Sequence, residues 1–209
     1  KQYFPKNGWV EHNPNEIWST TLKALKQVIK KTISLKGHIL TIGITNQRET
    51  TILWNKKTGK PIYNAIVWQD RRTQEYCKSL KNKNYENTFR KKTGLFIDPY
   101  FSATKIKWIL DNVKVSKKLL KTNNLLFGTV DTFLIWKLTK GKQQLTEATN
   151  ASRTMVLLAL VASVNCCLPL VNFQIKKVST VPNNKLLVFS NFFETFTLSK
   201  IHFILVAEK

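Results

Sequence analysis

Short apolar runs rich in β-branched residues alternate with segments of helical periodicity along most of this 209-residue chain. The runs predict strands and the segments predict helices, because Ile, Val and Thr favour extended backbone while helical apolar residues recur every three or four positions. The expected strands cover about residues 39–45, 51–54, 61–67 and 125–130, and the expected helices about 14–31, 71–81, 85–92, 102–112 and 131–138. This alternation indicates an α/β domain with partly parallel strand pairing.

Capping residues mark several of the expected boundaries. Asn13 is expected to cap the first helix, with Glu16 completing a capping-box-like arrangement. Ser102 and Asp131 are expected to cap two later helices. Gly94 follows the helix at 85–92, where a left-handed C-terminal cap needs a glycine. Residues 55–59 have the composition of a hairpin turn between two strands.

The composition changes abruptly near Met155. All seven glycines and all six tryptophans precede that point, and the last 54 residues contain neither. We therefore interpret residues 1–155 as a domain and residues 156–209 as an unrelated or frameshifted tail. Residues 156–171 are strongly apolar, but Asn165 and Pro169 interrupt a run that is already shorter than the roughly 20 residues that span a bilayer, so no membrane partner is predicted.

The charge is strongly positive, because 34 Lys and Arg against 12 Asp and Glu leave a net charge of +22. Only five of these cations are arginines, the residues that recognise phosphates and bases bidentately, and the lysines lie in pairs at element ends. No nucleic-acid partner is therefore predicted.

Three cysteines, two of them adjacent, fit neither a disulfide framework nor a zinc site and indicate a reducing, cytoplasmic setting. The start at Lys1, with neither Met nor a secretory leader, predicts an incomplete beginning.

Four residues near the expected ends of elements would suit a small polyol: Arg48, Glu49, Trp68 and Tyr100. Every hydroxyl both donates and accepts, so a polyol site needs a fixed donor, an acceptor and an apolar wall. Arg48 and Glu49 follow the strand at 39–45, which is expected to be buried and to feed a site at its end. Spacing alone favours a structural alternative, in which Arg48 and Glu49 form a solvated pair and the two aromatic rings belong to the core or its rim.

The other motifs in the sequence do not indicate a phosphate-binding, reactive-thiol or metal site. The sequence contains no glycine-rich phosphate loop, and residues 128–132 are predicted to be a plain strand exit and helix cap. Cys77 lies on the core face of its expected helix and is predicted to be buried and inert. No residues have the spacing of metal ligands. The polyol residues therefore remain the main candidate site.

Six segments carry a family resemblance: residues 8–18, 42–50, 59–73, 100–112, 127–132 and 149–155. One of them has the spacing of a family signature at Tyr100, Ser102, Lys105, Ile106, Trp108, Ile109, Asp111 and Asn112. In this order the segments resemble the glycerol kinases of the FGGY carbohydrate kinase family. The resemblance is specific because the segments are long and ordered, and it ends near residue 155.

The resemblance implies an actin- or hexokinase-type fold, in which two RNase H-like α/β domains close over a cleft. Residues 1–155 would be part of the N-terminal, polyol-binding domain. The implied reaction is the transfer of the γ-phosphoryl group of ATP, with Mg2+, to a terminal hydroxyl of glycerol. Arg48 and Glu49 match residues that hydrogen-bond glycerol, Trp68 matches the apolar wall, and Tyr100 matches a tyrosine that contacts the substrate. The full-length family also allows a homo-oligomer.

The sequence does not contain several other parts of that family. These are the opening strand pair with its Asp-x-Gly-Thr-Thr phosphate turn, the aspartate general base and the second domain with most of the adenosine site. Phosphoryl transfer depends on such parts for positioning and electrostatic stabilisation. We therefore assign no catalytic residue and expect this chain to be inactive alone. The alternative is a non-catalytic basic binding protein that reuses the domain, which would bind nucleic acid with a steep salt dependence.

Overall fold

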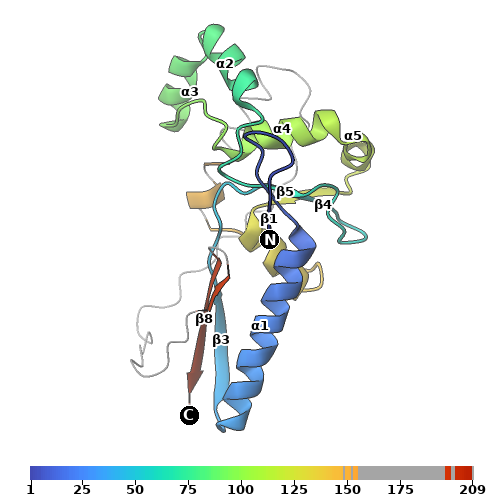
Figure 1. Cartoon of the computed structure of the whole chain (residues 1–209), viewed down its shortest axis with the longest axis vertical. Helices are drawn as coiled ribbons and strands as arrows, with labels where there is room; N and C mark the ends of the chain where they lie inside the picture. The colour runs from blue at the N-terminus through green and yellow to red at the C-terminus, as the bar shows by residue number, and fades with distance from the viewer. Residues whose placement is uncertain (148, 152, 155–195, 199–200, 209) are drawn as a thin grey trace.

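The computed structural model describes residues 1–147, 149–151, 153–154, 196–198 and 201–208. The helices are α1 (Pro14–Ser34), α2 (Gln74–Asn82), α3 (Glu86–Thr93), α4 (Ser102–Asn112), α5 (Lys114–Lys121) and α6 (Val130–Leu138). The strands are β1 (Gln2–Tyr3), β2 (Glu11–His12), β3 (His38–Ile44), β4 (Ile52–Asn55), β5 (Ala65–Ile66), β6 (Leu125–Gly128), β7 (Phe196–Leu198) and β8 (Ile201–Glu208). Helices α2 to α5 gather at one end, whereas α1, β3 and β8 extend from it side by side (Figure 1). No helix in these ranges is long and apolar enough to cross a membrane.

Helix α1 confirms the prediction for its first residues. The Asn13 side chain caps the helix by accepting a hydrogen bond from the backbone N–H of Asn15 at 2.9 Å. The expected capping box does not form, because the Glu16 carboxylate instead accepts a hydrogen bond from the hydroxyl of Tyr3. The carboxylate that would complete the capping box is thus bound to Tyr3, a residue outside the helix.

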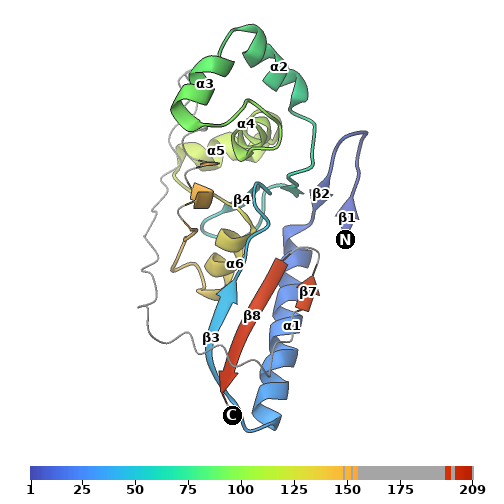
Figure 2. The same cartoon turned by 90° about the vertical axis from the view of Figure 1, so that its left-hand side faces the viewer.

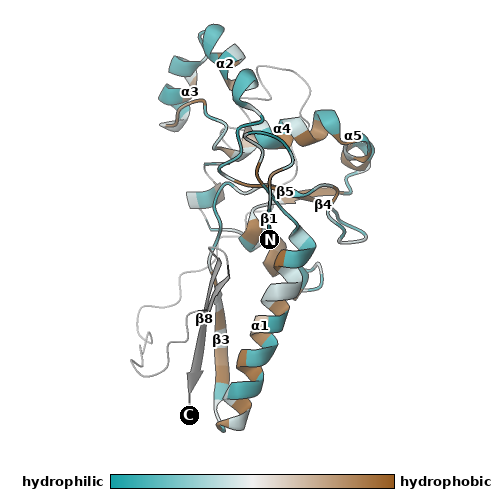
Figure 3. Ribbon diagram, in the orientation of Figure 1, coloured by the Kyte–Doolittle hydropathy of each residue, from teal (hydrophilic) through white to brown (hydrophobic). Residues whose placement is uncertain are grey.

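Strand β3 forms where the sequence predicts it, but it is exposed, so the prediction of a buried strand is wrong. The side chains of Leu40 and Ile42 are 61% and 38% exposed, and Ile44 at the end of the strand packs against a core cluster. The strand runs beside α1, outside the body that holds the other core residues (Figure 2). Its hydrophobic stretch is visible in Figure 3. A β-rich apolar run predicts extended backbone, but not which elements will cover it.

All strand pairings of the described residues are antiparallel, whereas the sequence predicted partly parallel pairing. The sheets have the orders β1-β2-β5, β3-β8-β7 and β4-β6. Four helices lie between β4 and β6 in the chain, so the connection is long enough for β6 to pair with β4 in either the parallel or the antiparallel direction.

Strands β7 and β8 come from the expected tail, and β8 pairs with β3. The domain boundary at residue 155 stays a prediction.

The core lies on both faces of β4 and β6. On one face Trp54 meets Phe133 of α6 edge to face, with ring centroids 5.3 Å apart. On the other face Leu53 and Phe127 pack in a cluster with residues of α4, which fixes that helix against the strands. A third cluster contains Cys77, which is 2% exposed and whose thiol pKa is raised to about 11 by burial. The predicted burial of Cys77 is confirmed, and the raised pKa disfavours the reactive thiolate.

The helix ends follow the predictions only in part. Gly94 closes α3 with a φ of 71°, which confirms the left-handed cap. Ser102 and Asp131 are not caps, because both lie inside their helices and the capping positions belong to Phe101 and Thr129. Both polar side chains instead make long-range contacts, described below. Helix α5 has no capping signal in its sequence and was not predicted.

The expected turn at residues 55–59 is confirmed. The Asn55 side chain accepts hydrogen bonds from the backbone N–H groups of Lys57 and Thr58, at 2.8 and 3.2 Å. Gly59 has a φ of 65°, and a Cβ atom added there would lie 2.8 Å from the ring of Trp136. Only glycine suits both the left-handed backbone and this close approach of α6.

A buried ion network fastens the chain near Trp68. The Arg72 guanidinium lies 2.7 Å from Glu11 and 2.8 Å from Asp70, and the three side chains are at most 3% exposed. It also stacks over the ring of Trp108 on α4, with its central carbon 4.6 Å from the centroid. Because these buried charges are paired and hydrogen-bonded, they tie β2 and α4 to the segment that carries Trp68.

Candidate functional site

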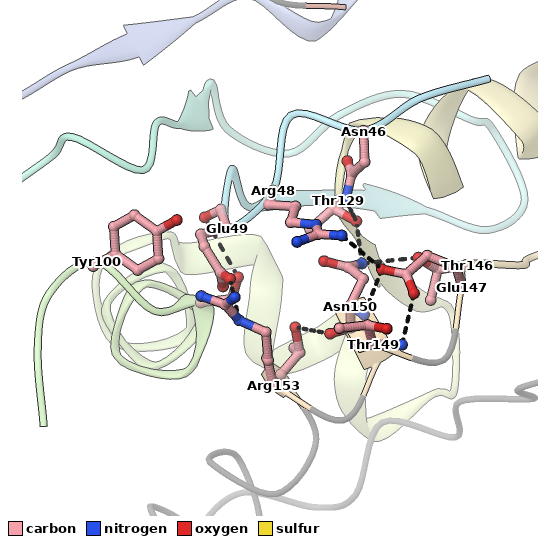
Figure 4. Close-up of polar contacts among 12 residues, drawn as sticks. Asn46, Arg48, Glu49, Tyr100, Thr129, Thr146, Glu147, Thr149, Asn150 and Arg153 are labelled. Carbon is pink, nitrogen blue, oxygen red and sulfur yellow. Dashed lines mark hydrogen bonds and ion pairs between the residues drawn. The ribbon is translucent and has the colours of Figure 1, made fainter. Parts of the chain in front are cut away.

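The loop that joins β3 to β4 carries the two polar candidates, Arg48 and Glu49 (Figure 4). Glu49 is completely buried and has a φ of 61°, in the left-handed region that residues other than glycine rarely adopt. Such a conformation persists only where surrounding contacts enforce it. The left-handed backbone therefore points the Glu49 side chain in a direction that an extended backbone would not give it.

The backbone carbonyl of Glu49 accepts hydrogen bonds from three side chains. Lys105 Nζ lies 3.0 Å from this oxygen, and the hydroxyls of Ser102 and Thr51 each lie 3.4 Å from it. Lys105 Nζ also donates to the carbonyl of Tyr100 at 2.5 Å. Burial lowers the pKa of Lys105 to about 7, although the negative charge of Glu49 opposes that shift. One buried amine thus connects the backbones of two candidate residues.

The Glu49 carboxylate has no hydrogen-bond donor among the described residues. Arg153 Nε lies 3.0 Å from Oε1, which makes an ion pair, but the pair lacks the geometry of a hydrogen bond. Burial raises the pKa of Glu49, and the charges of Arg153, Lys105 and Arg48 oppose this rise. Buried polar atoms are normally hydrogen-bonded, so a buried carboxylate that is paired with Arg153 but lacks hydrogen bonds is a candidate partner for a hydroxyl-bearing ligand.

The ring of Tyr100 lies near this carboxylate, and the ring of Trp68 contacts Tyr100 (Figure 4). The ring centroids of Trp68 and Tyr100 are 5.9 Å apart in an edge-to-face arrangement, and both residues are half-buried. The Arg153 guanidinium lies 5.9 Å from the centroid of Tyr100, so it contacts both the ring and Glu49. The arrangement places a buried acceptor near an aromatic surface, and a polyol site needs groups of both kinds.

Arg48 is directed away from Glu49, toward the segment after α6 (Figure 4). Its Nη2 atom lies 3.7 Å from Glu147, and the two side chains are 50% and 45% exposed. An exposed ion pair at this distance contributes little free energy, so the guanidinium is only weakly held. The structure thus brings Tyr100 near Glu49 and Trp68 against Tyr100, whereas the Arg48 side chain comes from the same loop but points elsewhere. Arg48 and Glu49 do not form the solvated pair of the structural alternative.

A second polar network holds the segment that carries Arg153. The Asp131 carboxylate accepts hydrogen bonds from the hydroxyls of Thr129 and Thr146, each at 2.5 Å. Asn150 Nδ2 donates to both of these hydroxyls at 2.8 Å. The network fastens the segment after α6 to the junction of β6 and α6. Asp131 thus has a structural task, and its contacts help to place Arg153 beside Glu49.

The sequence interpretation missed Lys105 and Arg153 as parts of this site. Lys105 stands four residues before Ile109 on the apolar face of α4, and a charged residue on such a face was a usable signal. Arg153 is one of five arginines in a chain whose other cations are lysines. Neither signal says which carboxylate or carbonyl the cation meets, because that contact is made across the fold.

The described residues do not themselves fit the ATP phosphates or Mg2+ that the resemblance implies. This part of the chain has no group of three or more His, Cys, Asp or Glu side chains placed for a metal ion. A Cβ atom at Gly128 would lie 2.6 Å from Cβ of Thr132, so this glycine allows α6 to pack closely on β6. The turn after β6 thus serves packing, and it offers no phosphate cradle.

Comparison with known proteins identifies the relatives of this chain. The N-terminal domain of the FGGY family of carbohydrate kinases matches residues 1–159. The glycerol kinases of Parabacteroides distasonis and Sinorhizobium fredii are each 59% identical to it over 156 residues, which make up 75% of this chain and 31% of each relative. The chain thus spans about a third of the length of the curated relatives it matches.

Solved structures agree with this result. The crystal structure of Plasmodium falciparum glycerol kinase with ADP has a TM-score of 0.68 and 43% identity, over 74% of this chain and 31% of that one. A xylulose kinase from Rhodospirillum rubrum shares the fold at 14% identity, with a TM-score of 0.60 over 77% of this chain and 34% of that one. The predicted actin- and hexokinase-type α/β fold is confirmed. With a family match that extends over residues 1–159, the chain belongs to the FGGY family of carbohydrate kinases.

Proposed function

We propose that this chain supplies the polyol-binding part of a glycerol kinase, which transfers the γ-phosphoryl group of ATP to a terminal hydroxyl of glycerol. The glycerol kinases among its relatives support this substrate. The observation that carries the proposal is the buried carboxylate of Glu49, which pairs with Arg153 at 3.0 Å but accepts no hydrogen bond from the described residues. A glycerol hydroxyl would supply the donor that this carboxylate requires.

Each candidate residue has a distinct task in the proposed complex. Glu49 accepts hydrogen bonds from glycerol hydroxyls, and Arg48 turns from its weak contact with Glu147 to donate to them. Trp68 covers the carbon chain, and Tyr100 completes the wall and adds a hydroxyl. A buried polar group left unsatisfied costs about 1 to 3 kcal/mol, so satisfying Glu49 would make glycerol binding favourable.

ATP and Mg2+ belong to the reaction of the whole kinase. The relative crystallised with ADP supports nucleotide use, whereas Mg2+ rests on the family resemblance. Since the described residues do not fit these groups, the role proposed for this chain is to bind glycerol, orient its terminal hydroxyl and exclude water. A reducing cytoplasm suits this role. We expect the isolated chain to show no ATP-dependent phosphorylation of glycerol above the rate without protein.

Nuclear magnetic resonance of the 15N-labelled chain tests the binding role directly. Glycerol should shift the indole N–H signal of Trp68 and the backbone amides of Glu49 and Tyr100, with the other five indoles as internal controls. The propane-1,3-diol control lacks the central hydroxyl and should bind more weakly. Glu49→Gln should remove most of the shift at unchanged thermal stability. Equal shifts at all six indoles, or an unchanged response in Glu49→Gln, would contradict the proposal.

A further inference from the structure

We propose that Lys105 is a positioning residue that locks the Glu49 loop and the Tyr100 segment into one glycerol-binding geometry. The inference rests on the proposed function, because it concerns the same site. Lys105 itself does not touch glycerol in this proposal. It acts through the backbone carbonyls of two residues that do.

The burial of Lys105 indicates that its amine has a specific task. The residue is completely buried on α4, beside the equally buried Ala103, Ile106 and Ile109. Moving an amine from water into such surroundings is unfavourable unless hydrogen bonds compensate. A methionine of similar length would fill the same volume without that penalty. The hydrogen bonds of Nζ are therefore what this lysine adds to the fold.

Those hydrogen bonds join two segments that are distant in the sequence. Nζ donates to the Glu49 carbonyl, which belongs to the loop between β3 and β4, at 3.0 Å. It also donates to the Tyr100 carbonyl, just before α4, at 2.5 Å. Both acceptors are backbone atoms, so the amine fixes the main chain of each segment and leaves their side chains directed at the site.

The backbone of Glu49 requires such a fixed point. Its φ of 61° is unfavourable for a residue with a Cβ atom, and it would relax to a negative value without enforcing contacts. Holding the carbonyl fixes the orientation of the peptide plane that follows Glu49, and with it the direction of the side chain. Ser102 and Thr51 also donate to this carbonyl, but their hydroxyls are more distant, each at 3.4 Å, whereas Lys105 also bonds to the carbonyl of Tyr100. Lys105 is thus the residue that couples both segments.

The test compares Lys105→Met with Lys107→Met in the full 209-residue chain. Lys107 lies on the same helix but is partly exposed and pairs with Asp111, so its substitution should leave the site unchanged. Glycerol affinity is measured by the Trp68 indole shift, well below the melting temperature of each variant. Lys105→Met should weaken glycerol binding at least about tenfold, while the amide signals of core residues such as Leu53 keep their positions.

Two further readouts separate positioning from a general structural role. Amide exchange of Lys105→Met should increase at Glu49 and Thr50 and at Tyr100, and less in β4 and β6. Ser102→Ala removes one donor to Glu49 and should weaken glycerol binding only about twofold to fivefold. This second variant keeps the inference testable if Lys105→Met does not fold.

The outcomes are distinguishable. If the unmutated chain shows no selective response to glycerol, the proposed function fails, and the inference fails with it. If the unmutated chain binds glycerol but folded Lys105→Met binds it equally well, only the inference is wrong. If Lys105→Met does not fold and Ser102→Ala keeps the wild-type affinity, the inference is also overturned.

Discussion

Arg153 Nε lies 3.0 Å from Oε1 of Glu49, and this ion pair joins the β3–β4 loop to the segment after α6. The Glu49 side chain is completely buried, whereas that of Arg153 is 29% exposed. Burial raises the pKa of Glu49, and the Arg153 charge is the foremost group that opposes the rise. Arg153 thus favours the ionised carboxylate, which is the form that accepts hydrogen bonds at both oxygens.

Replacing Arg153 by methionine should therefore make glycerol binding more dependent on pH. Without the guanidinium the pKa of Glu49 rises further, so more of the carboxyl is protonated under mildly acidic conditions. We expect glycerol affinity to fall roughly threefold to tenfold near pH 6 and to recover toward the wild-type value as the pH increases, since each pKa unit changes the ionisation ratio tenfold. Titration of the Trp68 signal from pH 5.5 to 8.5 checks this.

Arg153→Lys is the matched control, because it keeps the positive charge. Its pH profile should lie closer to wild type than that of Arg153→Met. A loss of affinity in Arg153→Met that is the same at every pH would show that Arg153 acts by shape or packing, and the electrostatic role would be wrong.

Arg48→Ala should impair catalysis without affecting stability. We expect roughly a 10²-fold lower kcat/KM for glycerol in a chimera that joins this domain to the remainder of the Parabacteroides distasonis glycerol kinase, because the substrate loses its charged donor. Glu49→Gln should also lower kcat/KM. The melting temperature of Arg48→Ala should stay unchanged, since the side chain is half-exposed and lies 3.7 Å from its ion-pair partner.

Arg90→Ala provides the comparison for this experiment, because Arg90 is exposed on α3, in a different part of the domain. Its kinetics should equal those of the unmutated chimera. Wild-type kinetics in both Arg48→Ala and Glu49→Gln would mean that the polyol role does not belong to these residues.

The β3–β4 loop marks the limit of sequence-based prediction in this protein. Asn13 and Gly94 were predicted correctly because each cap depends on a few neighbouring residues. Ser102 looks like a cap by the same local rules, but its hydroxyl bonds to the carbonyl of Glu49, 53 residues earlier in the chain. The left-handed backbone of Glu49 has no local signal either, since glutamate rarely adopts it.

The candidate site also contains some residues that the sequence identifies and others whose role depends on the fold. Residue types and family resemblance were sufficient to name Glu49, Trp68 and Tyr100. In the structure Tyr100 lies near Glu49 and contacts Trp68. The contacts of Lys105 and Arg153 depend on how α4 and the segment after α6 pack, and no spacing along the chain encodes them. Burial of β3 was predicted wrongly for the same reason, because burial depends on elements elsewhere in the fold.

The stability of the domain should rise with pH through the titration of Lys105. Its pKa is lowered to about 7 by burial, while Glu49, Asp70 and Asp98 raise it and Arg71 lowers it. The unfolded value is near 10.5, so between about pH 7 and 10.5 the unfolded chain binds more protons than the folded one. The free energy of unfolding should therefore increase with pH across this window, and this contribution should be constant below it.

Urea unfolding between pH 6 and 9.5 measures this effect. The stability of the wild type relative to Lys105→Met should increase from pH 7 upward, whereas its stability relative to Lys107→Met should stay constant. A flat difference between wild type and Lys105→Met would mean that Lys105 titrates near its ordinary pKa despite its burial.

The boundary at residue 155 remains a proposal, and β3 is the element on which it can be tested. Strand β8 pairs with β3 from His38 to Ile44, so residues beyond the boundary contact the domain through backbone hydrogen bonds. The β3 side chains are nevertheless largely exposed, and only Ile44 of this strand is found packed against a described core cluster. Loss of β8 should therefore remove little apolar burial from the domain.

Deleting residues 156–209 should improve solubility and leave the melting temperature of the remaining domain no lower. Apolar, weakly charged runs such as residues 156–171 promote aggregation, and their removal should reduce it. Leu205→Pro is the matched point variant, because proline removes a backbone donor from β8, the central strand of its sheet. In both proteins hydrogen exchange should increase along β3 but not in β4. If either change also exposed the amides of β4, or lowered the melting temperature by several degrees, β8 would belong to the cooperative unit and the boundary would be wrong.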